Sequence, residues 1–148
     1  MDLQEAAAQA SGASIVNCCG LDSIPSDLGV KFLQEQAQQQ FGRYCDRVKM
    51  RVLVMKGGAS GGTMASGMNI YKEAAGNRAL QAELKDPYSL CGENYDRRLS
   101  QHDVSVEYDE DFNAWTGPFV MAAINTRVVL RSNAIAVQIG RASCRERV

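Results

Sequence analysis

The chain has 148 residues and a formal net charge of −1, and 45% of its residues are hydrophobic, which is typical of a folded globular protein. The near-neutral charge gives no argument for nucleic acid or an anionic membrane, and no apolar run is long enough to span a bilayer. The first residues lack the features of a signal peptide, and the five cysteines have no metal-ligand spacing. The sequence therefore predicts a cytoplasmic protein with reduced thiols and no metal site.

The N-terminal part predicts a helix, a strand and a second helix. Residues 2–10 are rich in Ala and Gln and favour a helix that ends at Gly12. Residues 15–19 are small or β-branched, as in a strand covered on both faces of a sheet. The second helix is expected over 24–41. We expect its apolar residues to face a sheet and its glutamines to face water: Leu28, Phe32, Ala37 and Phe41 on one side, and Gln34, Gln36, Gln38, Gln39 and Gln40 on the other.

A tight turn joins this strand to the second helix. Gly20 allows a sharp change of direction, Ser23 is placed to cap the helix, and Pro25 fits its first turn. Asp27 adds negative charge near the positive end of the helix. Such a turn carries N–H groups to the carboxyl edge of a sheet, where α/β proteins bind ligands. A ligand site and an ordinary capped junction both remain open.

The middle of the chain predicts a strand, a glycine-rich turn and a helix. Apolar and polar residues alternate over 46–55, which indicates a half-exposed strand. The glycine-rich segment 56–63 lacks the spacing of either phosphate-binding fingerprint, so we expect a hairpin or a closely approached loop. Residues 69–85 favour an amphipathic helix with a weak point at Gly76, and Pro87 follows its end.

The C-terminal part predicts a long loop, a strand and a helix. Residues 88–103 are polar and lack periodicity, and His102 within them is expected at the surface. A strand over 104–108 precedes an acidic turn, 109–111, that we expect to be solvated. A helix is expected over 119–132. Five of its residues are available for burial: Val120, Ala123, Ile124, Val128 and Leu130.

Two arginines on this last helix, Arg127 and Arg131, are one turn apart. Together they have the geometry to hold a phosphate or a carboxylate, since guanidinium groups bind such anions bidentately. A solvated helix face would explain them equally well.

Four segments in series carry a family resemblance: 19–29, 60–66, 86–90 and 115–127. They resemble the saccharopine dehydrogenase-like oxidoreductases, and more closely the branch that includes the trans-acting enoyl reductases. The resemblance extends from about the first helix to residue 137. Leu21 stands where that family would have Phe, and Asn17 where it would have His. Both departures lie close to the turn at Gly20 and bear on substrate choice.

The resemblance implies an α/β fold in which residues 1–42 end a Rossmann-type, doubly wound dinucleotide-binding domain. Residues 43–138 would be part of an α+β substrate or dimerisation domain. It also implies an NADP or NAD cofactor whose reduced form transfers hydride to an acyl substrate, either small or carried on a partner protein, with the main phosphate-binding motif upstream of this chain. A homodimer stays open. The alternatives are a non-catalytic binding or scaffolding member of the fold, or a fragment that is inactive alone.

The resemblance also suggests site residues. Asp22 is the catalytic candidate, able to orient the substrate, relay a proton or simply lock the turn. The cofactor-binding candidates are Cys19, Gly20, Ser23 and Pro25. The substrate-binding candidates are Thr63, Arg127 and Arg131.

The last ten residues, 139–148, differ in character from the helix before them, being rich in Arg and without apolar periodicity. Their sequence is what one reading frame through a common sequencing adapter would encode. We therefore expect this tail to be non-native and to make no defined contacts with the rest of the chain.

Overall fold

The computed structural model describes residues 2–45, 47–58, 61–92, 95, 97 and 105–138. These residues form five helices and one two-stranded antiparallel sheet, so the chain combines α and β structure with helix predominant. In chain order the elements are α1 (Asp2–Ser11), α2 (Ile24–Phe41), α3 (Gly61–Ala75), α4 (Arg78–Lys85), β1 (Glu107–Asp109), β2 (Ala114–Thr116) and α5 (Ala122–Gln138).

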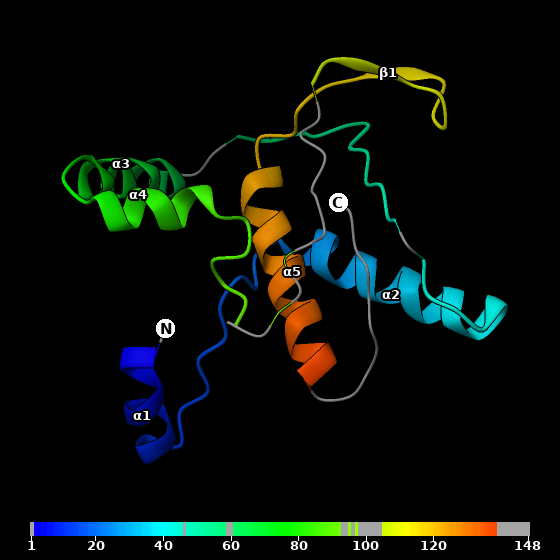
Figure 1. The fold of residues 1–148 in the computed structure, drawn as a ribbon. Coiled ribbons are helices and arrows are strands. Elements are labelled where there is room, and N and C mark those ends of the chain that lie inside the picture. Colours follow the sequence, from blue (N-terminus) through cyan, green and yellow to red (C-terminus); the bar gives the residue numbers. More distant parts are fainter. Residues whose placement is uncertain are drawn as a thin grey trace.

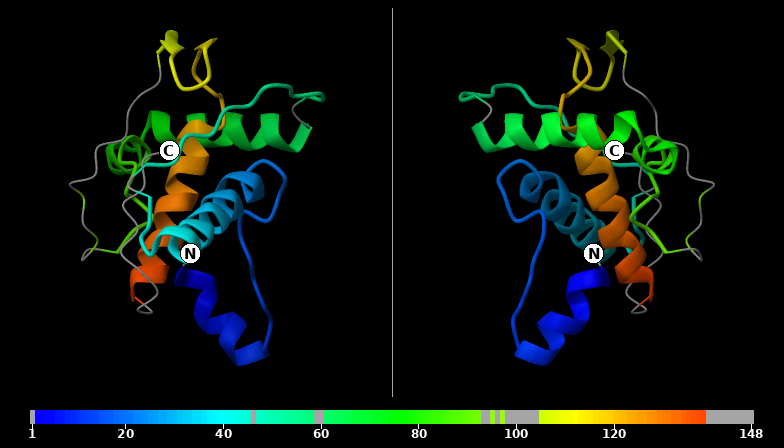
Figure 2. Two further views of the ribbon diagram at one scale, coloured as in Figure 1. Left: turned by 90° about the vertical axis from the view of Figure 1, so that its right-hand side faces the viewer. Right: turned by 90° about the vertical axis from the view of Figure 1, so that its left-hand side faces the viewer.

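Helix α5 is the centre of the arrangement, and α2 packs across it (Figure 1). Helices α3 and α4 lie side by side as a separate pair, and the β1–β2 hairpin projects beyond the N-terminal end of α5 (Figure 2). Helix α1 packs on none of the other described elements. The exposed surface is 11410 Å². A compact 16.1 kDa monomer would expose about 7400 Å², so the chain is an open structure with little core.

Two small apolar clusters meet on α5. Val129 packs with Val30 of α2 and with Val48, which joins α2 and the segment after it to α5. Leu130, the next residue, packs in a second cluster. That cluster contains Tyr88, Cys91, Leu130 and Ala134, with Tyr95 against it. Helix α5 therefore connects α2 to the turn that follows α4.

The bounds of α2 are confirmed, but of the residues predicted to face inward only Ala37 is buried. Pro25 lies in the first turn, and Gly42 ends the helix in a left-handed conformation, φ 67°, with its N–H donating to Gln38 O over 3.0 Å. Leu28 and Phe32 are 54% and 59% exposed. The buried residues are Ser26, Val30, Gln34 and Ala37. The prediction assumed a sheet beneath α2, whereas its described partner is α5.

Gln34 was predicted to face water and is instead almost fully buried. Its side-chain amide donates to Cys45 O over 2.9 Å and accepts from Cys45 N over 2.7 Å. This pair of bonds holds the segment after α2 against the helix.

Both strands predicted in the first half of the chain are absent from the described structure. Residues 15–19 form no ladder, and Ile15 and Val16 are 60% and 73% exposed. The described residues of 46–55 also form none, although Val48 is buried. A strand needs a neighbour for its N–H and C=O groups, and no described segment pairs with either.

The predicted helix over 69–85 is two helices that meet at its predicted weak point. Helix α3 begins at Gly61, earlier than expected, so Gly61 to Thr63 are helical rather than part of a turn. The break falls at Gly76, and Asn77 caps α4 by accepting from Leu80 N over 3.1 Å. Helix α4 ends at Lys85, just before Asp86-Pro87, as predicted. The predicted end of the first helix at Gly12 is likewise confirmed, and Gly12 has φ 71°.

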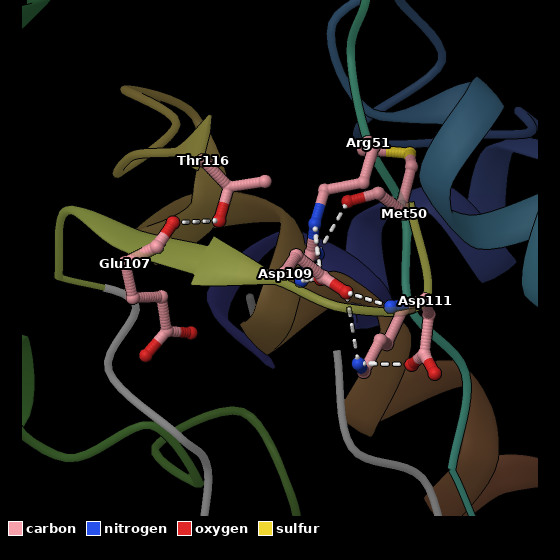
Figure 3. Close-up of polar contacts among 7 residues, drawn as sticks. Met50, Arg51, Glu107, Asp109, Asp111 and Thr116 are labelled. Carbon is pink, nitrogen blue, oxygen red and sulfur yellow. Dashed lines mark hydrogen bonds and ion pairs between the residues drawn. The ribbon is translucent and has the colours of Figure 1, made fainter. Parts of the chain in front are cut away.

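The hairpin falls slightly later than the predicted strand. Tyr108 pairs with Trp115 in its register, and the two rings meet edge to face with centroids 5.8 Å apart. Asp109 was predicted to be solvated and is only 5% exposed. It binds Arg51, and also Lys49 over 3.4 Å (Figure 3). The prediction was wrong because these cationic partners lie about sixty residues away in the sequence.

The ion cluster sets the charge states of its members. Burial alone would raise the pKa of the Asp109 carboxyl, but the Arg51 hydrogen bond, the Asp111 amide and the nearby Lys49 and Arg51 charges outweigh it and hold this pKa below its usual value. The hydrogen bond to Asp111 is the main cause that raises the pKa of Lys49. Arg51 also lies over the Phe112 ring, 5.6 Å from its centroid. These contacts fasten the hairpin to the segment after α2.

The last helix, α5, begins three residues later than predicted and has a different buried stripe. Leu130 is buried as expected, whereas Val120, Ala123 and Ile124 are exposed and Val128 is partly buried. Asn125, Val129, Asn133 and Ala134 complete the buried stripe. His102 and the tail 139–148 lie outside the described residues.

Candidate functional site

The turn before α2 is closed by its own backbone. The N–H groups of Ser23 and Ile24 both donate to Gly20 O, over 3.2 and 3.0 Å. Cys18, at its start, has a left-handed backbone with φ 57°. A Cβ added at Gly20 would overlap the Asp22 carboxylate, which folds back over this residue. A side chain at position 20 would therefore require the exposed Asp22 carboxylate to move.

Asn125 of α5 holds this turn through three hydrogen bonds. Its Nδ2 donates to Asp22 O over 2.9 Å and to Ser26 Oγ over 2.9 Å. Its Oδ1 accepts from Ser23 Oγ over 3.1 Å. Asn125 is 1% exposed, so the bonds are shielded from water. They join two segments that are about a hundred residues apart in the sequence.

Two further contacts extend this junction along α2. Ser26 Oγ lies 3.6 Å from Met50 Sδ, and Ser132 Oγ donates to Asp27 Oδ2 over 3.0 Å. The Asp27–Ser132 bond lies about two turns of α5 beyond Asn125. The contact between α2 and α5 is thus polar beside the turn and at Asp27. It also has an apolar part, in which Val30 packs with Val129.

The structure divides the candidates of the turn into an exposed and a buried group. Cys19, Gly20, Asp22 and Pro25 are exposed. Ser23 is 2% exposed, and its hydroxyl is committed to Asn125. The prediction that Ser23 caps α2 with its side chain is wrong, because its backbone is already helical, φ −115° and ψ −34°, and its side chain is turned to α5.

The N–H groups at the start of α2 are also used internally. Those of Ser26 and Asp27 donate to Ser23 O, and Pro25 has none. The helix start therefore offers fewer donors to a ligand than the sequence suggests. Within the described residues, the amides of Leu21 and Asp22 have no acceptor.

The three substrate-binding candidates, Thr63, Arg127 and Arg131, have different surroundings. The Arg127 guanidinium donates to Ala123 O and to Leu84 O in the last turn of α4, where helix carbonyls lack partners of their own. Arg131 lies near the Cys91 thiol. Burial raises the pKa of that thiol, and the Arg131 charge opposes the shift. Thr63 is exposed in the first turn of α3. Arg127 is therefore anchored to the backbone.

Sequence reasoning missed Asn125. It lies within the segment 115–127, from which only Arg127 was selected. The available signal was its spacing: Asn125 is four residues before Val129 and eight before Asn133, on the same face of the helix. A polar residue in a buried stripe must find hydrogen bonds, and Asn133 does so by donating to Tyr95 Oη over 2.6 Å.

Neither a membrane-spanning helix nor a metal-binding cluster is found among the described residues. None of the described helices is both long and apolar enough to cross a membrane. In the part of the chain that the structure describes, no group of three or more His, Cys, Asp or Glu side chains is arranged to hold a metal ion.

Comparison with known proteins identifies relatives. The chain is 34% identical over 146 residues to a trans-acting enoyl reductase of Mycobacterium ulcerans, which covers 91% of the chain and 34% of that protein. It is 31% identical over 147 residues to a trans-acting enoyl reductase of Mycobacterium tuberculosis, with the same coverage of both. The chain is thus homologous to these proteins over most of its length and spans about a third of theirs. No family model and no solved structure matches.

Proposed function

We propose that this chain is part of an NAD(P)-dependent oxidoreductase, related to the saccharopine dehydrogenase-like enzymes, that transfers hydride to an acyl substrate. The observation that carries the proposal is the homology to proteins named trans-acting enoyl reductases over 91% of the chain. An enoyl reductase adds hydride and a proton across a carbon–carbon double bond. A nicotinamide cofactor is the ordinary source of that hydride.

The geometry of the turn supports a role beside the reacting groups. It exposes the Asp22 carboxylate and the amides of Leu21 and Asp22 on one short stretch. Such amides would bind a carbonyl oxygen or the nicotinamide carboxamide, and the carboxylate would orient the substrate or relay a proton. Cys19, Gly20 and Pro25 would line the cofactor side.

The exposed apolar surface supports the proposed domain division. Leu28 and Phe32 on α2, and Ile15 and Val16 before the turn, are all more than half exposed. The sheet of a Rossmann-type domain, with residues 1–42 as its end, would cover them and supply strand neighbours for 15–19. Residues 43–138 would then belong to the substrate domain.

The site chemistry on the substrate side follows from the same arrangement. Arg131 and Thr63 are the candidates left to contact an acyl carbonyl or a carrier group, since Arg127 holds the end of α4. In this proposal Arg127 shapes the substrate side by fixing α4.

The direct experiment uses the protein extended to the length of its relatives. NADPH and NADH oxidation would be followed with an enoyl thioester on an acyl carrier and with the same acyl group on a small thiol. We expect oxidation that depends on the enoyl group. Cofactor binding without any turnover on either thioester would favour a non-catalytic binding protein and contradict the proposal.

A second experiment uses the chain alone. It lacks a glycine-rich phosphate cradle of either fingerprint, so we expect it to bind NADPH no tighter than about millimolar. Calorimetry on a monodisperse sample measures this directly. Micromolar binding would show that the cofactor site is contained in these residues and that the proposed division is wrong.

A further inference from the structure

All three hydrogen bonds of the Asn125 amide go to the turn before α2 and the first turn of α2. A primary amide has one accepting oxygen and two N–H donors. The oxygen of Asn125 accepts from Ser23, and its nitrogen donates to Asp22 O and Ser26 Oγ. All three partners lie within five consecutive residues, and none of the amide's capacity is used by α5 itself.

The bond to Asp22 has a particular consequence for the exposed carboxylate. Within the described residues the Asp22 side chain makes no hydrogen bond, so only its backbone is fixed from outside the turn. That fixing comes from Asn125. The carboxylate itself occupies the space that a side chain at position 20 would fill. The direction in which Asp22 points therefore depends on a residue of α5.

We propose that Asn125 is a positioning residue that sets the geometry of the turn and, through it, the direction of the Asp22 carboxylate toward bound substrate. The inference rests on the proposed function for its catalytic meaning. Because α5 also carries Arg131 and anchors α4 through Arg127, the same helix aligns the turn with the substrate side. Helix α5 thus sets the position of the turn relative to the substrate side.

The structural part is tested on this chain by amide hydrogen exchange. Asn125→Ala leaves buried groups of Ser23 and Ser26 without their partner, which should speed exchange at Ser23 and Ile24 by roughly 5- to 150-fold. The matched control is Asn133→Ala, a buried Asn of the same helix that bonds Tyr95 instead. The control should leave these two amides unchanged. Equal protection in Asn125→Ala and wild type would overturn the proposal, as would an equal effect of the control.

Asn125→Asp keeps the size and shape of the side chain and so separates hydrogen bonding from packing. An ionised carboxylate can still accept from Ser23 but cannot donate to Asp22 O, whereas the protonated acid regains one donor. We therefore expect faster exchange than wild type at neutral pH that returns toward wild type as the acid protonates. Circular dichroism checks that helix content is kept. A pH-independent excess in Asn125→Asp would indicate a packing effect and contradict positioning.

The catalytic part is tested in the protein extended to the length of its relatives. We expect Asn125→Asp to lower kcat for the enoyl thioester by at least tenfold while KM for NADPH changes less than threefold, and Asn133→Ala to lower kcat much less. If wild type turns over and Asn125→Asp keeps its kcat, the inference fails and the proposed function stands. If wild type is inactive, the proposed function and the catalytic part of the inference both fail. The exchange data alone then report whether Asn125 holds the turn.

Discussion

Leu130→Ala tests whether α5 organises the chain. Leu130 has no exposed surface, heads the fully buried side chains of the described residues by volume, and packs with Tyr88, Cys91 and Ala134. Truncating a buried leucine costs about 2–5 kcal/mol, more where the site cannot collapse. This cluster is small and lies near the surface, so we expect the lower part of that range, about 2–3 kcal/mol. Opening of the turn after α4 should become roughly 30- to 150-fold more frequent.

The Cys91 thiol provides the assay. It is buried, and burial raises its pKa, so it should react slowly with a disulfide reagent at neutral pH. The measurement uses a background in which the other cysteines are replaced by Ser, so that only Cys91 reports. Leu130→Ala should speed its labelling by the factor above. Ile135→Ala, on the same helix at a position 42% exposed, is the control and should change labelling little. Similar rates in both variants would refute the central role of this cluster.

Two further predictions concern polar contacts. The pKa of Asp109 is lowered in the fold, so its contribution to stability is complete above its unfolded value of about 3.9 and is lost as the pH falls through the lower folded value. The fluorescence of Trp115, the single tryptophan, on the hairpin should therefore change below about pH 4 in wild type. At the same ionic strength, Asp109→Asn should lack that transition. Arg127→Ala should fray the last turn of α4, costing about 1 kcal/mol, measured as faster amide exchange there and a small loss of helix signal. Unchanged exchange would show that the Arg127 contact with the α4 backbone contributes nothing.

The features predicted well from the sequence are those that a residue imposes on its own backbone. Gly12 and Gly42 end helices because their left-handed conformation is cheap without a Cβ. Pro25 fits the start of α2 because no N–H is needed there. The break between α3 and α4 falls at Gly76, a residue of low helix propensity. None of these outcomes depends on what packs against the segment.

The features predicted poorly depend on partners distant in sequence. Residues 15–19 have strand propensity, but a strand forms only with a neighbour, and propensity cannot supply one. The buried side of α2 was assigned to Leu28, Phe32, Ala37 and Phe41 on hydrophobicity; of these only Ala37 is buried, and contact with α5 buries Val30 instead of the larger side chains. Asp109 looked solvated until Lys49 and Arg51 were brought beside it.

The candidate site shows the same division. The turn at Gly20 was identified from local residues, since Gly20, Ser23 and Pro25 each favour a turn or a helix start. Its attachment to Asn125 could not be identified that way, because a polar residue in an apolar stripe has many possible partners. Only the fold selects Ser23 and Asp22 O among them.

The role of Asp22 separates from turn formation by a pair of substitutions. Its carboxylate is exposed and makes no hydrogen bond within the described residues, while its backbone carbonyl carries the bond from Asn125. Asp22→Asn and Asp22→Ala both keep that carbonyl, so each should change the unfolding free energy of this chain by no more than about 0.5 kcal/mol, the usual range for surface positions. A turn-locking side chain would behave differently, with Asn silent and Ala costing about 1 kcal/mol.

If Asp22 acts chemically in the extended protein, both variants should lose turnover to a similar degree, because both lose the charge and the proton-accepting oxygen. The control is Glu110→Gln, which removes one exposed negative charge on the hairpin and should leave turnover unchanged. Thermal denaturation and steady-state rates on the same samples separate the two roles. Wild-type turnover in Asp22→Asn would exclude Asp22 as the catalytic residue and leave the amides of the turn as its only chemical contribution.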